Sequence, residues 1–162
     1  MLWLYAVILL AAALALFGVY RVLGTPTRLS PLDYGVVLAD ITASVGRAAG
    51  RLREALERDP DEDLDGVAAE SRRIFQTGYY QTLRLRPASG IDKAAAVRAE
   101  LGRACEAYDW ASRMLGGESR RNPLVLAAAR QLLAAGDAAL RQVERELSAA
   151  QAPARENPAP SP

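Results

Sequence analysis

The segment from Asp59 to Asp65, within the sequence DPDEDLDGVAAE, concentrates five acidic residues among seven. Read from Asp61, the acids alternate as D-x-D-x-D-G, which is how an EF-hand calcium loop begins, with a glycine for the sharp turn. The twelfth position is then Arg72, where the loop needs a bidentate glutamate, and Glu70 stands at the tenth position. A loop starting two residues earlier puts Glu70 twelfth but places Leu64 where glycine belongs.

The spacing D-x-D-x-D-G-x-x-x-E resembles short extracellular calcium-binding modules of the excalibur type, with Ala69 at the position of their cysteine. The resemblance implies calcium held by Asp61, Asp63, Asp65 and Glu70. The competing interpretation is the start of a helix, because an acid caps the first amides, Pro60 suits the first helical position and first-turn acids complement the dipole. We favour the helix start and keep calcium as the alternative.

The sequence has no histidine, and Cys105 is its only cysteine. These counts exclude histidine-cysteine zinc sites, His-ligated haem, a Ser-His-Asp triad and an internal disulfide. Cys105 falls in a predicted helix, where a small apolar filler is favoured over a reactive thiol. No other acids are paired for acid-base chemistry, so we expect neither an enzyme nor a cofactor. The net charge of +1 gives no reason to expect binding to nucleic acid.

The first 20 residues, MLWLYAVILLAAALALFGVY, carry no charged side chain. At about 1.5 Å per residue, a helix of this length crosses the hydrocarbon core of about 30 Å. Trp3 and Tyr20 lie near opposite ends of the run, where aromatic rings favour the interface. A cleaved signal peptide is the alternative, but the segment lacks a basic start and an A-x-A-like exit. We therefore predict a retained single-pass anchor over residues 1–23.

The remaining sequence predicts a linker, a helical domain and a tail. GTPTRLSP, residues 24–30 with Pro31, breaks the helical pattern. Cap chemistry then recurs at Ser30, Asp59, Ser89 and Asn122, which predicts helices over about 31–58, 60–86, 91–115 and 123–150. Short connections favour antiparallel neighbours, so the expected fold is all-α, an up-down-up-down four-helix bundle over 31–151. The Pro- and Ala-rich tail, 152–162, is expected to be disordered.

Apolar residues recur at alternating spacings of four and three in these helices. The pattern predicts three core stripes that contain, in chain order, Tyr34, Leu38, Ile41, Val45, Ala48, Leu52 and Ala55; Ala94, Val97, Leu101, Ala104, Tyr108, Ala111 and Leu115; and Val125, Ala129, Leu132, Gly136, Ala139, Val143 and Leu147. The second helix has a rougher stripe of Leu64, Val67, Ser71, Ile74, Gly78 and Leu85.

Basic residues near the predicted anchor indicate its orientation. None precedes the span and Arg21 and Arg28 follow it, so the positive-inside rule places the helical domain in the cytoplasm, with a periplasmic domain as the alternative. The connection between the second and third helices would return to the bilayer. A membrane-surface collar is therefore predicted from Arg21, Arg28, Arg84, Arg86 and Lys93, with solvated charges and local salt bridges as the alternative.

Aromatic and basic residues on the second helix suggest a protein-binding face, since interfaces are enriched in tyrosine and arginine. The expected partner-binding residues are Tyr79, Tyr80, Arg72 and Arg73. For Trp110, core burial is favoured over ligand stacking. The leading hypothesis is a membrane-anchored, non-enzymatic interaction or assembly protein, such as an accessory subunit of a larger membrane complex. The alternative is a membrane-tethered ligand or calcium sensor that uses residues 59–70.

Overall fold

The computed structural model describes residues 27–29, 31–58, 64–87 and 92–156. Four long helices account for most of them: α2 (Pro31–Glu57), α3 (Leu64–Arg84), α4 (Asp92–Leu115) and α5 (Pro123–Glu156). A short 3-10 helix, η1 (Gly117–Arg121), lies between α4 and α5. Two three-residue strands, β1 (Thr27–Leu29) and β2 (Leu85–Pro87), pair in parallel. The described residues are therefore almost entirely helical, as the sequence predicts.

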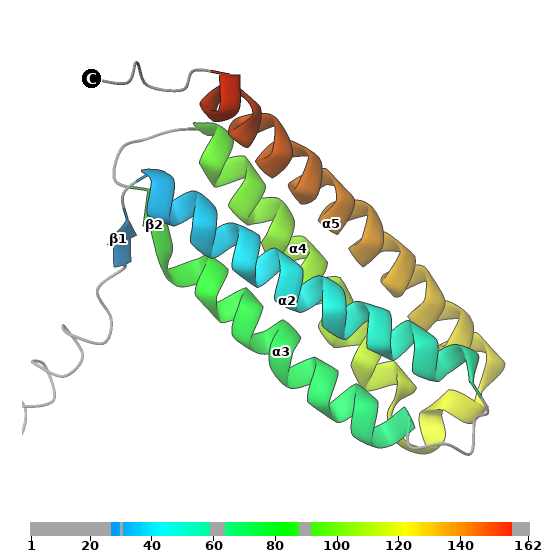
Figure 1. The fold of residues 1–162 in the computed structure, drawn as a ribbon. Helices are drawn as coiled ribbons and strands as arrows, with labels where there is room; N and C mark the ends of the chain where they lie inside the picture. Colours follow the sequence, from blue (N-terminus) through cyan, green and yellow to red (C-terminus); the bar gives the residue numbers. More distant parts are fainter. Residues whose placement is uncertain (1–26, 30, 59–63, 88–91, 157–162) are drawn as a thin grey trace, which may run out of the picture.

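The four helices lie side by side (Figure 1). Contacts join α2 to α3, α3 to α4 and α4 to α5, and α5 also touches α2. These contacts make the described part of the chain a helical bundle. The strand pair lies at the end of the bundle that contains the start of α2 and the end of α3 (Figure 1).

The starts of α2 and α5 follow the signals in the sequence, whereas the predicted caps Ser30, Asp59 and Ser89 lie outside the described residues. Pro31 and Pro123 are the first residues of α2 and α5, where the missing amide hydrogen is not needed. Asn122 caps α5, because its Oδ1 accepts a hydrogen bond of 2.9 Å from the amide of Leu124. The bounds predicted from these signals agree with α2, α4 and the beginning of α5 to within one or two residues, which is the scatter expected of helix ends.

One core cluster runs through the described bundle and contains most of the predicted stripe residues; on α5 it omits Val125 and includes Leu133 and Leu140, which the stripe did not contain. On α2 and α4 every predicted stripe residue is buried or partly buried against the core. On α3 the stripe differs from the prediction, because Ala68, Phe75 and Thr82 are buried whereas Val67 and Ile74 are only partly buried. Phe75, which the predicted stripe of the second helix omits, is fully buried and stacks on Tyr108 at a centroid distance of 5.1 Å.

Several features differ from the expectations. The expected tail begins at Ala152, but α5 continues to Glu156, because alanine, arginine and glutamate sustain a helix and the α5 pattern runs on without a capping glycine. The strand pair and η1 have no counterpart in the prediction, since three-residue strands carry too few side chains to show a period.

The predicted anchor, residues 1–23, lies outside the described residues. Within the described part of the chain, the stretch Pro123–Ala150 is long and apolar enough to cross a membrane. Core helices of soluble proteins pass the same test, and this one packs its apolar side against α4 and α2. It also carries Arg130, Asp137 and Arg141 among its central residues. We therefore assign Pro123–Ala150 to the bundle core.

Candidate functional site

Exposed apolar side chains gather where α3 meets α4. Among the large apolar residues that the structure describes, five are strongly exposed, and three of these lie on the two helices: Tyr80 at 64%, Leu83 at 53% and Trp110 at 50%. Isolated exposed side chains need no explanation, but a group on one face marks a contact surface. The other two, Val36 and Leu124, lie apart on α2 and at the start of α5.

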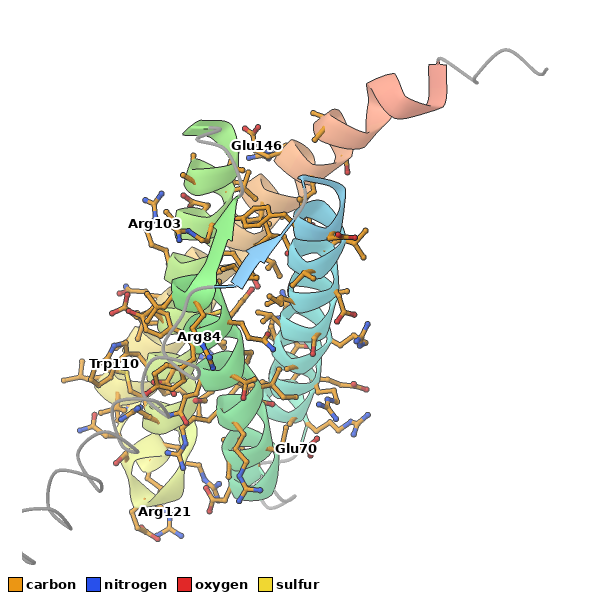
Figure 2. The ribbon with its side chains drawn as sticks, turned by 90° about the vertical axis from the view of Figure 1, so that its left-hand side faces the viewer. Glu70, Arg84, Arg103, Trp110, Arg121 and Glu146 are labelled. Atoms are coloured by element: carbon orange, nitrogen blue, oxygen red, sulfur yellow. The ribbon has the colours of Figure 1, made fainter. Side chains whose placement is uncertain are left out.

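A groove of about 210 Å³ runs between α3 and α4 on this face. Its lining, which we call the aromatic groove, consists of Gln76, Tyr79, Tyr80, Cys105, Glu106, Asp109, Trp110 and Arg113. The rings of Tyr79 and Tyr80 meet edge to face at a centroid distance of 6.1 Å. Trp110 projects outward from α4 (Figure 2). The groove therefore presents aromatic surface at its rim and polar groups along its length.

Helical spacing explains why these residues share the groove. On α4, Cys105 and Tyr108 point into the core, so Glu106, Trp110 and Arg113, three or four residues apart, follow one another along the outer side. On α3, Phe75 and Gly78 are buried, which turns Tyr80 outward because successive residues advance by about 100°. Tyr79 is intermediate and packs partly against the core.

Asp109 links the two helices beneath the rim. It accepts a hydrogen bond of 3.1 Å from Nε2 of Gln76 on α3. It also forms a 2.9 Å ion pair with Arg113 on its own helix. The guanidinium of Arg113 lies over the ring of Trp110, 5.2 Å from the centroid. These contacts connect the indole, its cation and the neighbouring helix in one polar network.

The structure divides the four residues that the sequence proposed for partner binding. Tyr79 and Tyr80 line the aromatic groove. Arg73 instead lines a separate groove between α2 and α3, together with Asp40 and Gln81. Arg72 is half-buried, seven residues before Tyr79, or about 10 Å along the helix. The tyrosines therefore gain Trp110 and Arg113 as neighbours rather than the arginine pair.

Trp110 and Arg113 were missed as members of this site. The sequence favoured core burial for Trp110 because it follows the core stripe of the third helix, whereas the structure leaves half of the side chain exposed. A signal was present, since Glu106, Trp110 and Arg113 repeat at spacings of four and three one position away from core residues. The spacing alone does not specify which side of α4 faces α3.

The predicted basic collar gathers at one end of the bundle as far as the backbone describes it. Arg28 of β1 and Arg86 of β2 are register partners in the parallel pair. Arg84 is the last residue of α3, and Lys93 lies in the first turn of α4. Arg98 donates a 2.8 Å hydrogen bond to the carbonyl of Leu85 and so ties α4 to β2. Arg21 lies outside the described residues.

The acidic stretch is only partly described, because Asp61 and Asp63 fall outside the described residues. The carboxylate of Asp65 accepts hydrogen bonds from the Gly117 amide at 2.7 Å and from Arg120 at 3.2 Å. Glu70 instead pairs with Arg51 of α2 at 3.0 Å. These two carboxylates are therefore held by different neighbours. Within the described ranges, no three metal-ligating side chains come together.

Cys105 lies at the floor of the aromatic groove but is fully buried. Burial raises the pKa of its thiol to about 12, so the sulfur stays protonated at neutral pH. A protonated, inaccessible thiol is a poor nucleophile. Cys105 therefore acts as the small apolar filler that the sequence predicts.

The fold and this face define a class: a helical bundle with an aromatic groove on one side. Shape, rings and a few charges in such a groove suit reversible binding of another molecule. Comparison with protein-family models, with curated proteins and with solved structures finds no match to the chain.

Proposed function

We propose that the protein is a membrane-anchored interaction or assembly protein whose up-down-up-down four-helix bundle docks a partner on the α3–α4 face, as an accessory subunit of a larger membrane complex does. The observation that carries the proposal is the joint exposure of Tyr80, Leu83 and Trp110 on that face. Aromatic residues with a neighbouring arginine are the residues that dominate binding energies at protein interfaces. The anchor is the uncharged segment of residues 1–20.

The basic end of the bundle supports attachment to the cytoplasmic leaflet. Arg28 of β1 and Arg86 of β2 are register partners in the parallel strand pair, so the backbone places both residues at this end. Each basic residue near anionic headgroups contributes about 1 kcal/mol. The backbone brings Arg84 and Lys93 to the same end. In the proposed arrangement these four residues and Arg21 face the bilayer.

Affinity purification of the tagged full chain from mild detergent tests the docking face. We expect a protein partner to be recovered with the unaltered chain and lost with Tyr80→Ser combined with Trp110→Ser. The matched control is Val36→Ser combined with Leu124→Ser, which removes two apolar side chains of equal or greater exposure elsewhere. Equal recovery by both double variants would reject this face as the docking surface. Circular dichroism establishes that both remain helical.

The alternative is a membrane-tethered ligand or calcium sensor at Asp61, Asp63, Asp65 and Glu70. It has less support, because the described members of that set, Asp65 and Glu70, already hold Arg120 and Arg51. Calcium would have to compete with both contacts. Calorimetric titration of the full chain with calcium decides it, since micromolar binding that disappears in Asp61→Asn with Asp63→Asn would replace the docking proposal with the sensor.

A further inference from the structure

Glu106 stands out among the acids of the bundle surface. It is exposed on α4 one turn before Trp110, and both residues line the aromatic groove. Glu106 makes no hydrogen bond or ion pair with any residue that the structure describes. The nearest base along the helix, Arg103, pairs with Glu100 instead. The groove therefore contains a carboxylate without a counter-ion beside exposed rings.

The other charges of the groove cancel. Asp109 forms an ion pair with Arg113 at 2.9 Å and accepts a hydrogen bond from Gln76. Glu106 then leaves one negative charge in excess among the lining residues. Aromatic rings add to this, because their faces carry the negative part of the ring quadrupole. The electrostatic complement of the groove is a cation.

The groove already shows how it holds a guanidinium. Arg113 places its guanidinium 5.2 Å from the centroid of Trp110 and donates hydrogen bonds to Asp109. One ring and one carboxylate thus satisfy one arginine. Glu106, with Tyr80 and the second face of the indole, provides the same pair of groups for another cation. Tyr80 is 64% exposed, so access to its ring is open.

We propose that the aromatic groove receives an arginine side chain from the partner protein, with Glu106 as its counter-ion and Tyr80 and Trp110 as its stacking surfaces. This inference rests on the proposed docking function and names the chemistry of the partner. Arginine fits better than lysine, because a guanidinium stacks on rings, forks onto a carboxylate and is more weakly hydrated than an ammonium.

Fluorescence of Trp110 reports on the site directly. Tryptophan occurs only at positions 3 and 110, so Trp3→Phe in the full chain makes Trp110 the sole emitter. The probe is acetylated tetra-arginine amide, and its control is the tetra-citrulline amide, which keeps the shape and removes the charge. In an uncharged detergent we expect a saturable change of Trp110 emission with the arginine peptide and none with the citrulline peptide.

Two variants locate the binding. Glu106→Gln should lower the affinity for the arginine peptide about fivefold, as expected for an exposed ion pair that acts together with an aromatic ring. Glu144→Gln is the matched control, because Glu144 is an exposed carboxylate on α5 that makes no ion pair within the described residues. Arg113→Met should tighten binding, since it frees Asp109 and one face of Trp110 from the internal cation.

Equal binding of the two peptides, or equal loss in the two glutamate variants, overturns the inference. A response to phosphocholine without a response to tetra-arginine also overturns it and assigns the groove to a lipid headgroup. The peptide experiments do not test the docking function. That function is rejected only if the double variant Tyr80→Ser with Trp110→Ser still recovers the partner protein. Loss of the partner in that variant together with a silent arginine peptide keeps the docking face and rejects the arginine.

Discussion

The hydroxyl of Tyr108 on α4 donates a hydrogen bond of 2.6 Å to Asp137 on α5, at the edge of the core. The other carboxylate oxygen of Asp137 accepts a 2.7 Å bond from Arg53 of α2. Three helices are thus joined through one carboxylate. Tyr108 is fully buried, and hydrogen bonds to charged groups are among the stronger ones in proteins.

Removing the hydroxyl with Tyr108→Phe is expected to lower the free energy of unfolding by about 1 kcal/mol. The loss stays below the range of about 1.5–3 kcal/mol for charged partners, because Asp137 keeps Arg53 and its side chain is 16% exposed to water. Denaturant unfolding followed by circular dichroism measures it. Tyr80→Phe, which removes a hydroxyl from an exposed ring, should leave the free energy of unfolding unchanged. Equal stability of the unaltered chain and both variants would show that the Tyr108 hydrogen bond contributes nothing.

Alkaline pH should destabilise the bundle through the same residue. Burial first, and then the hydrogen bond and negative charge of Asp137, raise the pKa of Tyr108 far above its ordinary value. The unfolded chain releases this proton near pH 10, whereas the folded chain keeps it. The stabilisation is therefore complete below about pH 10 and is lost as pH rises further. The tyrosinate absorbance of Tyr108, taken as the difference from Tyr108→Phe, should appear only with unfolding; its appearance in a chain that is still helical would contradict this.

Adding one methyl group at Gly136 should disrupt the core. A Cβ there would lie 2.6 Å from Cε1 of Tyr108, and that ring is held between α5 and Phe75. We expect Gly136→Ala to cost about 1–3 kcal/mol from overpacking, which exceeds the gain of up to about 1 kcal/mol from better helix propensity. Gly50→Ala on α2 meets nothing within 4 Å and should stabilise by up to that amount. Equal midpoints of thermal unfolding for the two variants would contradict the close approach.

Cys105 should be unreactive toward thiol reagents until the bundle unfolds. Its side chain is fully buried, and burial raises its pKa to about 12. Since the thiolate is the reactive form, labelling of the native full chain should be slow and should track the unfolded fraction as denaturant increases. Fast stoichiometric labelling without denaturant would mean that the α3–α4 groove opens far more often than the packing of Gly78 against the sulfur allows.

Much of the fold could be read from local rules. Pro31, Pro123 and the Asn122 cap set helix starts, and the three-four spacing on α2 and α4 placed Leu38, Val45, Leu101 and Tyr108 in the core. On α3 two apolar stripes compete, one through Val67 and Ile74 and one through Ala68 and Phe75. Only the neighbouring helices decide which of them is buried, so the predicted stripe followed Val67 and Ile74 and omitted Phe75.

The residues of the aromatic groove were harder to predict than the core. Tyr79 and Tyr80 were identified because two adjacent aromatic residues on a helix cannot share one core. Arg72 and Arg73 were grouped with them because interfaces are enriched in arginine and tyrosine, but Arg73 lines the groove between α2 and α3. Trp110 and Arg113 belong to the groove because α4 packs against the side of α3 that carries Tyr79 and Tyr80, opposite the groove with α2. Contacts between helices of this kind depend on which faces meet, and one sequence does not specify that pairing.

The parallel pairing of Thr27, Arg28 and Leu29 with Leu85, Arg86 and Pro87 has a mechanical consequence. Tension applied to the chain ahead of β1 does not act on the first turn of α2 alone. The strand pairing passes part of that load to β2 at the end of α3, where Arg98 of α4 donates a 2.8 Å hydrogen bond to the Leu85 carbonyl. The N-terminal segment is thus connected to two separate points of the bundle, the start of α2 and the end of α3.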